Sequence, residues 1–414
     1  MKREGNSNSG KRLLIIGGGA AGVFCAVNAA RQVPGLEVIV AEKTTKLLSK
    51  VKVSGGGRCN VTHDCREIGE MVKRYPRGER FLKKAFHYFF TTDTIEWFQE
   101  RGVALKTEPD GRMFPVTNSS QTIIDCLLNE ATKYGVRFLM SRSVEKIETS
   151  SEGFSVSFSN SEVIHADFVC IACGGFPKLS QFDWIKALGH TIQEPVPSLF
   201  TFNLPGNPIT ELMGISIEKA KVKIAGSKLA DEGPLLITHW GLSGPAILKL
   251  SAWGARELAS KNWNFTAIVN WLPEYNDNSL RDAIGELRFS IASQKISNKN
   301  PFGLPARLWE YILKLSGIKE EWRWADLPSA EQNKLIKNIT GWEAVVKGKT
   351  TFKDEFVTAG GVTLSEVDPN TMMSKIVPNL YFAGEILDVD GVTGGFNFQN
   401  AWTSGAVAAS NLKI

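Results

Sequence analysis

The sequence predicts an α/β protein with a domain built on a parallel sheet. Three apolar strands that each run into a glycine turn predict the sheet, and they begin near Lys11, Phe168 and Leu380. The chain has 414 residues, which is more than one domain usually holds. With 43% hydrophobic and 22% charged residues, it has enough apolar material for a large core.

The first strand leads into a dinucleotide-type turn. Residues 11–16 (KRLLII) are typical of a buried parallel strand, residues 17–22 (GGGAAG) match G-x-G-x-x-G, and residues 23–31 favour a helix. Gly17 allows the tight turn, Gly19 lets the backbone approach a pyrophosphate, and Gly22 lets the helix pack against the strand. The helix N-terminus then offers free N–H groups to the phosphates. A glycine turn without a ligand is the alternative.

A second strand, residues 37–41, ends at Glu42. An acid roughly 20 residues beyond the glycines can accept hydrogen bonds from ribose hydroxyls, and it would repel the 2′-phosphate of NADP. Residues 13–30 contain no charge, which also fits a signal peptide or a short membrane helix. The regular glycines favour the turn, and we expect no membrane domain.

Three further segments favour FAD over NAD. The triple glycine at 55–57, followed by Arg58, can lie against a flat ligand, although a flexible linker has the same composition. The strand at 168–171 runs into Gly174-Gly175, and its Cys170 and Cys173 are expected to be small core residues rather than a redox pair. The Gly394-Gly395 pair opens a final helix, whose dipole would stabilise reduced flavin; a plain helix cap is the alternative.

Several longer segments give the chain a family resemblance: KVKVSGGGRCNVTH at 50–63, CGGFPKLS at 173–180, THWGLSGPAIL at 238–248 and AGEILDVDGVTGGFNFQNAWTSG at 383–405. With these, the sequence resembles the BaiN/YhiN-type flavoproteins, also described as aminoacetone-oxidase-like FAD-binding enzymes. The resemblance implies an α/β fold in which an inserted α+β domain separates the two halves of a Rossmann-like FAD-binding domain. It also implies redox chemistry on a small organic substrate. It also implies a backbone contact of Val144 with adenine. Where the family often has threonine, this chain has Cys173, so a hydroxyl is lost there.

Each residue expected to contact FAD lies in a glycine turn, at a strand end or at a helix N-terminus. They are Gly17, Gly19, Ala20, Ala21, Gly22, Glu42, Lys43, Gly55, Gly57, Arg58, Cys59, Asn60, Val144, Ala172, Cys173, Gly174, Gly384, Glu385, Gly395, Phe396 and Asn397.

The FAD domain is expected to combine residues 1–192 with residues 353–414. Residues 193–352 would form the insert, which begins in a proline cluster and should comprise a β-barrel-like piece and helices. We expect this insert to cap the flavin ring and exclude water. Residues 81–100 favour one helix within the first segment.

The predicted activity is hydride transfer between flavin N5 and a small organic substrate. No second G-x-G-x-x-G is present, so NADH or NADPH would dock transiently, or another donor or oxygen would serve. The sequence identifies no catalytic acid or base clearly. His63 and His239 are the candidates, and a purely structural role is the alternative for each of them. A metal site is not expected.

Two other functions stay open. Cys59 and Cys65 could form the redox pair of a flavin disulfide reductase, although their spacing is one residue longer than usual in such pairs. An RNA-modifying flavoprotein is favoured only by the net charge of +5, so a nucleic-acid partner is not expected. The basic run at 73–84 fits an anion-binding patch or, more simply, a solvated helix face. The six scattered cysteines favour a reducing, cytoplasmic setting.

Overall fold

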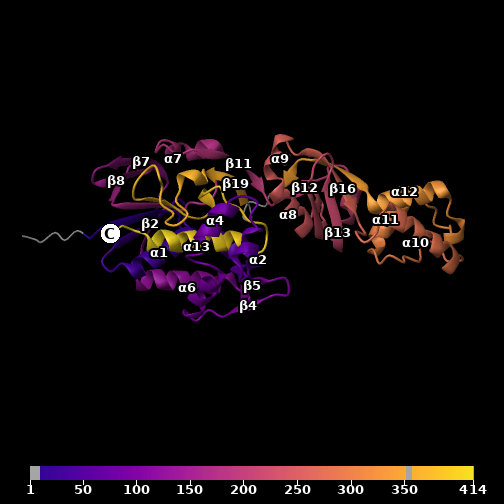
Figure 1. The fold of residues 1–414 in the computed structure, drawn as a ribbon, viewed down its shortest axis with the longest axis horizontal. Coiled ribbons are helices and arrows are strands. Elements are labelled where there is room, and N and C mark those ends of the chain that lie inside the picture. The colour runs from indigo at the N-terminus through magenta and orange to yellow at the C-terminus, as the bar shows by residue number, and fades with distance from the viewer. Residues whose placement is uncertain (1–9, 351–356, 414) are drawn as a thin grey trace, which may run out of the picture. The chain divides into compact units, whose positions relative to one another are not determined.

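The computed structural model describes residues 10–350 and 357–413. The chain divides into two compact units, one of residues 1–197 with 353–414 and the other of residues 198–352 (Figure 1). We call them the first unit and the inserted unit. The domain crossing expected at residue 193 falls inside β11 (Ile192–Ser198), which pairs with β19 (Val357–Val362). This pairing keeps residues up to Pro197 with the first unit.

A five-stranded parallel sheet forms the centre of the first unit. Its order is β20-β10-β1-β2-β6, and its strands are β1 (Arg12–Ile16), β2 (Glu37–Glu42), β6 (Arg137–Met140), β10 (Phe168–Ile171) and β20 (Leu380–Phe382). Because all five strands are parallel, their carboxyl ends meet at one edge of the sheet. The Rossmann-like split domain predicted from the sequence is confirmed, since β20 joins from the C-terminal segment.

Two helices from opposite ends of the chain pack against each other in this unit. They are α1 (Ala20–Gln32) and α13 (Phe396–Ser410), which lie side by side in Figure 1. Gly405 allows the close approach, because a Cβ there would lie 2.7 Å from the carbonyl oxygen of Ala21. The uncharged stretch that begins at Leu13 therefore forms β1, the glycine turn and α1. Within the two described ranges, no helix combines the length and apolarity that crossing a bilayer requires.

The remaining elements of the first unit surround this sheet. They are α2 (Ser49–Gly57), α3 (Ile68–Val72), α4 (Glu79–Ala85), α5 (Thr91–Gln99), α6 (Ser120–Lys133), α7 (Asp183–Lys186), β3 (Thr62–His63), β4 (Leu105–Thr107), β5 (Arg112–Pro115), β7 (Val144–Ser150), β8 (Gly153–Phe158) and β9 (Val163–Ala166). The single helix expected over residues 81–100 is wrong, because α4 and α5 are separate. The N–H of Phe90 donates to the Asp93 carboxylate (2.6 Å) and starts α5 afresh.

The inserted unit contains a curled antiparallel sheet and a helical piece. The sheet order is β17-β16-β13-β14-β15-β12-β18, with β12 (Thr201–Asn203), β13 (Ser216–Ile224), β14 (Ala230–Ile237), β15 (Gly241–Ser243), β16 (Asn264–Asn270), β17 (Trp342–Lys347) and β18 (Lys349–Thr350). Its two end strands, β17 and β18, are joined through Gly348 alone, so the sheet curls back on itself. The barrel-like piece plus helices predicted from the sequence is confirmed.

One hydrophobic core joins both parts of the inserted unit. The helices are α8 (Pro245–Trp253), α9 (Ala255–Ser260), α10 (Asp277–Ser290), α11 (Ala306–Leu315) and α12 (Ser329–Thr340). Trp271 after β16, Trp309 in α11 and Trp324 before α12 are fully buried in this single core. The unit is therefore stabilised mainly by apolar burial that spans its sheet and its helices.

Candidate active site

The glycine turn between β1 and α1 is shaped by packing at two positions and by open space at a third. A Cβ on Gly17 (φ +113°) would lie 2.5 Å from the carbonyl oxygen of Ala172, and one on Gly22 would lie 2.0 Å from that of Gly17. A Cβ on Gly19 would meet no atom within 4 Å. No side chain of the described residues caps α1, so its first N–H groups face this space. A helix N-terminus of this kind is suited to an anionic group.

A cavity of about 310 Å³ lies at the carboxyl ends of β1 and β2. Five of its lining residues were predicted from the sequence: Gly17, Glu42, Lys43, Val144 and Cys173. The prediction missed the residues that follow β6 and those around α7, namely Arg142, Ser143, Phe176, Ser180, Gln181 and Trp184. The position of Arg142 and Ser143 directly after a strand of the same parallel sheet is the pattern that could have identified them.

Glu42 is held at this cavity by two backbone groups. Its Oε2 accepts a hydrogen bond from the N–H of Gly18 (2.8 Å), and its Oε1 accepts one from the N–H of Thr44 (2.8 Å). The carboxylate is thereby oriented beside the glycine turn, where it can also accept hydrogen bonds from a diol. This arrangement fits the ribose of an adenine dinucleotide.

A second group of predicted residues meets near the N-terminus of α1. A Cβ on Gly384 (φ +78°) would lie 2.8 Å from the Cβ of Ala21. The Oε1 of Glu385 accepts from the N–H of Thr358 (2.9 Å), and its Oε2 pairs with Lys50 Nζ (2.6 Å). Neither Lys50 nor Thr358 was predicted, because each contact joins segments that are far apart in the sequence.

Thr358 also carries a buried hydroxyl that lacks a partner among the described residues. Its Oγ1 would lie 2.6 Å from a Cβ on Gly175, beside the turn of Gly174 that follows β10. Because a buried unpaired hydroxyl is costly, it indicates a place where a bound polar group is expected.

The N-terminus of α13 forms the third part of the site. A Cβ on Gly395 (φ +91°) would lie 2.5 Å from the carbonyl oxygen of Thr62. With its amide oriented to donate to that oxygen (3.0 Å), Asn60 accepts from the N–H of Gly395 (2.9 Å). No described side chain caps α13 by hydrogen bonding, and its first turn contains no acid. The positive end of the helix dipole is thus available to a ligand.

His63 lies directly beside this helix start. Its Nδ1–H donates to the carbonyl oxygen of Gly394 (3.1 Å), and its ring stacks on Phe396 with centroids 4.7 Å apart. Burial lowers the pKa of His63 from its ordinary 6.5, and the nearby charge of Arg74 acts in the same direction. His63 is therefore neutral at pH 7, with Nδ1 as the protonated nitrogen.

Several predicted residues have structural partners. Arg58 pairs with Glu108 (2.6 Å) and stacks on the ring of Phe114 (4.0 Å to the centroid). The side chain of Asn397 both accepts from and donates to the backbone of Gly391 (2.8 and 2.9 Å). Gly55 and Gly57 take left-handed φ values of +58° and +83° at the kinked end of α2.

The second weak catalytic candidate lies in the inserted unit. His239 is exposed at the turn between β14 and β15, where its ring lies over that of Trp240 with centroids 4.2 Å apart. This exposed pair contrasts with the half-buried His63 of the first unit.

The cysteine side chains do not favour disulfide chemistry. All six are free, and burial raises the pKa of Cys59 to about 12. Cys59 is fully buried, whereas the Sγ of Cys65 donates to the carbonyl oxygen of Glu67 at 3.4 Å. A thiolate at Cys59 is strongly disfavoured, so it lacks the character of a reactive thiol. No cluster of His, Cys, Asp or Glu able to hold a metal ion occurs in the part of the chain that the structure describes.

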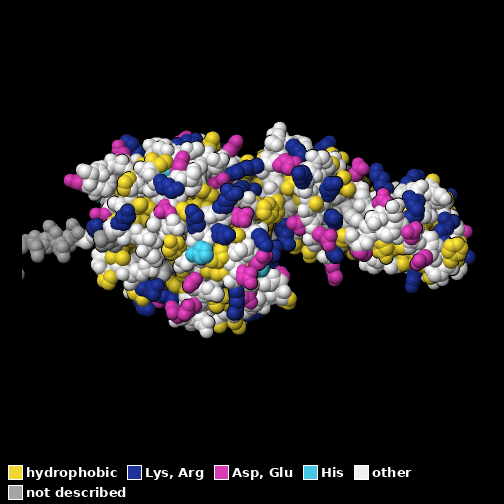
Figure 2. Space-filling view, viewed as in Figure 1, with side chains coloured by type: hydrophobic (Ala, Val, Ile, Leu, Met, Phe, Trp, Pro, Cys, Tyr) yellow, Lys and Arg dark blue, Asp and Glu magenta, His cyan; other side chains and the backbone are white. Residues whose placement is uncertain are grey.

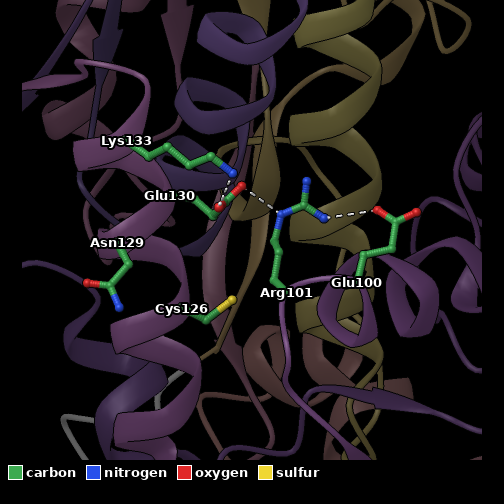
Figure 3. A pocket seen from close by; sticks show the side chains of 6 residues that line it. All are labelled: Glu100, Arg101, Cys126, Asn129, Glu130 and Lys133. Atoms are coloured by element: carbon green, nitrogen blue, oxygen red, sulfur yellow. Dashed lines mark hydrogen bonds and ion pairs between the residues drawn. The ribbon is translucent and has the colours of Figure 1, made fainter.

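A larger hollow, about 410 Å³, lies between α5 and α6 (Figure 3). Its charges satisfy one another: Glu130 pairs with Arg101 (2.9 Å) and with Lys133 (3.3 Å), and Arg101 pairs with Glu100 (3.3 Å). We place the functional site at the glycine turn instead, because the groups there are arranged around open space.

The residues of the first unit fit FAD. The N-terminus of α1 suits its phosphates, and the N-terminus of α13 suits the polar edge of its ring. The Glu42 carboxylate suits the ribose, and the buried Thr358 hydroxyl could bond to a polar group of the cofactor.

Comparison with known proteins gives a consistent result. The family model described as "HI0933-like protein Rossmann domain" matches residues 11–411. The chain is 32% identical to the ribosomal RNA dihydrouridine synthase of Escherichia coli (strain K12), over 96% of this chain and 97% of that protein. It is 28% identical to the 3-dehydro-bile acid delta(4,6)-reductase of Clostridium scindens, over 96% of this chain and 98% of that protein.

A solved structure shares the fold. The 3-ketosteroid-delta4-(5alpha)-dehydrogenase of Rhodococcus jostii RHA1 superposes with a TM-score of 0.51 at 13% identity, over 98% of both chains. At this identity the likeness concerns the fold alone. Together with the family match across nearly the whole chain, these findings show that the protein belongs to the HI0933-like Rossmann family and is an FAD-dependent oxidoreductase.

Proposed function

We propose that the protein reduces a carbon–carbon double bond that is conjugated with a carbonyl group. The FAD assignment rests above all on the glycine turn, where Gly19 faces open space beside the fixed carboxylate of Glu42. The bond type is supported by the two relatives, because a bile acid delta(4,6)-reductase and a dihydrouridine synthase both saturate such a bond. In uracil this bond is the 5,6 double bond, which is conjugated with the C4 carbonyl.

The chemistry divides between the cofactor and the protein. When bound, reduced FAD supplies a hydride from N5 to the carbon β to the carbonyl, and a proton at the α carbon completes the saturation. The α1 N-terminus and Glu42 would hold the dinucleotide, and the α13 N-terminus would offer positive potential to the polar edge of the ring. Asn60 would keep that helix start in place.

His63 is the candidate proton donor within the first unit. Because burial lowers its pKa, little of its protonated form is present at pH 7, and its Nδ1–H is already committed to Gly394. We therefore propose that Nε2 of His63 accepts a proton from solvent and passes it to the α carbon of the substrate. His239 remains the candidate of the inserted unit, which we propose takes part in substrate binding.

The electron donor is proposed to be NADH or NADPH. A second dinucleotide fold is not found in the described residues, so the nicotinamide cofactor would bind transiently. An anaerobic titration tests this point: either cofactor should bleach the visible absorbance of the oxidised flavin. A flavin that neither cofactor bleaches would rule out the nicotinamide donor.

The substrate class is tested separately from the donor. The holoprotein is photoreduced without nicotinamide and then mixed anaerobically with a steroid enone, with free uridine or with ribosomal RNA. Reoxidation of the flavin together with loss of the substrate double bond is expected for at least one of them. A flavin that stays reduced with all three would overturn the proposal. The protein stripped of FAD serves as the control.

A further inference from the structure

The surface of α3, α4 and the turn between them carries a strong excess of positive charge. Residues 73–84 contain six Lys or Arg and one acid, Glu79. The side chains of Lys73, Arg74, Arg80, Lys83 and Lys84 are exposed. We call these five the basic face. Figure 2 shows dark-blue side chains over this part of the first unit.

The basic face is poorly explained as an ordinary helix surface. Phe81, Leu82 and Ala85 are buried, so Arg80, Lys83 and Lys84 share the outer side of α4 at helical spacing. Like charges at this spacing repel one another, and Arg80 stands in the first turn, where the helix dipole disfavours a cation. Lys73 pairs with Glu70 (2.6 Å), whereas no ion pair of Arg80, Lys83 or Lys84 is found within the described ranges. A bound polyanion would relieve this repulsion.

Residues 74–77, which include part of the basic face, bond to the loop that precedes α13 and to the first residue of that helix. The carbonyl oxygen of Arg74 accepts from the N–H of Val392 (2.9 Å), and the hydroxyl of Tyr75 donates to the carbonyl oxygen of Phe396 (2.7 Å). Arg77 forms an ion pair with the fully buried Asp390. Burial is the main cause of the lowered pKa of His63, and the nearby charge of Arg74 lowers that pKa further. The basic face thus adjoins the start of α13 and His63, the candidate proton donor.

An exposed aromatic ring stands at the end of this surface. Tyr88 follows α4 and is 58% exposed, and His87 beside it is exposed as well. A row of cations with an exposed ring is the arrangement that single-stranded nucleic acids bind, because phosphates pair with the cations and bases stack on the ring. An anionic bilayer offers no flat group for stacking.

We propose that the basic face with Tyr88 is a docking surface for RNA. This inference rests on the proposed function, because the uracil bases of RNA carry a double bond of the proposed kind. It differs from the expectation, based on net charge alone, that nucleic acid is not a partner. The phosphates of the bound RNA lie on the basic face.

Charge reversal at three positions tests the docking surface. The holoprotein and the variant Arg80→Glu/Lys83→Glu/Lys84→Glu are titrated with a fluorescein-labelled 20-nucleotide RNA and with protein-free ribosomal RNA. The variant should bind at least about tenfold more weakly at 50 mM salt, and the slope of log K against log salt should fall by about 2. Its FAD content and its photoreduction should match the wild type.

A matched control tests whether RNA binding depends on the position of the charges or only on the net charge of the protein. The variant Lys223→Glu/Lys228→Glu/Lys299→Glu makes the same change in net charge at exposed positions of the inserted unit. It should keep most of the RNA affinity. Equal losses in both variants, no loss in the first, or absence of RNA binding by the wild type would each overturn the docking surface. Binding to phosphatidylglycerol vesicles without binding to RNA would do so too.

The outcomes distinguish this inference from the proposed function. An enzyme that reduces a steroid enone but binds no RNA retains the proposed function and loses the docking surface. Tyr88→Ala should weaken RNA binding about fivefold or more, within the range for a lost stacking contact, and Tyr88→Phe should restore it. Failure of phenylalanine to restore binding would exclude stacking as the role of Tyr88.

Discussion

Lys50 and Glu385 form an ion pair of 2.6 Å although 335 positions separate them along the chain. The pair joins α2 to the loop after β20, and the N–H of Thr358 fixes the other carboxylate oxygen. Three segments that lie far apart in the sequence are therefore brought together at one carboxylate beside the glycine turn.

The two partners of this pair should differ in effect when replaced. Glu385→Ala should weaken FAD binding by about tenfold or more, because the Thr358 N–H and the Lys50 charge both lose their acceptor. Lys50→Met should change the free energy of unfolding by less than about 1 kcal/mol, since its side chain is 49% exposed. Fluorescence titration of the stripped protein with FAD and urea unfolding measure the two quantities. Equal FAD affinity of Glu385→Ala and the wild type would contradict the assignment of Glu385.

The glycine turn offers a sharper contrast. Gly19→Ala should leave the protein without FAD as stable as the wild type, because the new Cβ meets nothing within 4 Å. It should nevertheless weaken FAD binding, since that Cβ enters the space for the pyrophosphate. Gly22→Ala should instead destabilise the protein with or without FAD, because its Cβ would lie 2.0 Å from a backbone oxygen. Thermal unfolding of the stripped protein and FAD titration check both halves. A stable Gly22→Ala protein would be inconsistent with this packing.

The buried ion pair of Arg77 and Asp390 should be sensitive to the loss of one partner. Asp390 is fully buried and the side chain of Arg77 is 10% exposed. Asp390→Asn should lower the free energy of unfolding by about 3–5 kcal/mol, because the buried guanidinium of Arg77 then loses the charge of Asp390. Adding Arg77→Met should recover part of the loss. Glu37→Gln, which weakens the partly exposed pairs with Arg12 and Arg137, is the control and should cost less than about 1 kcal/mol per pair. Urea unfolding measures all four proteins.

His190 should make the protein less stable in mild acid. Burial lowers its pKa from 6.5, with Glu366 opposing, and its Nε2 contacts the Ser374 hydroxyl at 2.8 Å. Below pH 6.5 the unfolded chain binds a proton that the folded chain does not, so the free energy of unfolding falls as pH falls toward the folded pKa. The slope from this residue is at most about 1.4 kcal/mol per pH unit. His190→Gln should flatten the dependence between pH 7.5 and 5.5, whereas the exposed His165→Gln should not; an unchanged slope would remove His190 as its source.

Thiol counting tests the disulfide alternative. All six cysteines are free in the structure, so six thiols should react in the denatured protein with and without prior reduction. Cys59→Ser/Cys65→Ser should retain flavin reduction by the electron donor. Two fewer thiols in the untreated protein would reinstate the disulfide reductase.

The sequence predicted the parts of the site that depend on local backbone conformation. The turn at Gly17 to Gly22, the acid at the end of β2 and the helix start at Gly395 each follow from neighbouring residues. The contacts of Lys50, Thr358 and Arg142 could not be predicted in the same way, because they depend on how distant segments meet in the folded sheet. The break between α4 and α5 was missed because Phe86 and Phe90 continue the apolar pattern across it, although the cap that Asp93 makes is a local feature.

The order of the central sheet has a consequence for biosynthesis. Its edge strand β20 and the helix α13 beside α1 come from the last part of the chain, after the whole inserted unit. Since folding follows synthesis from the N-terminus, the inserted unit can complete its own core while the first unit still lacks a strand and a helix. FAD would therefore bind only after translation has passed Gly405. A ribosome stalled within the insert would hold a partly folded inserted unit joined to a first unit that cannot yet bind FAD.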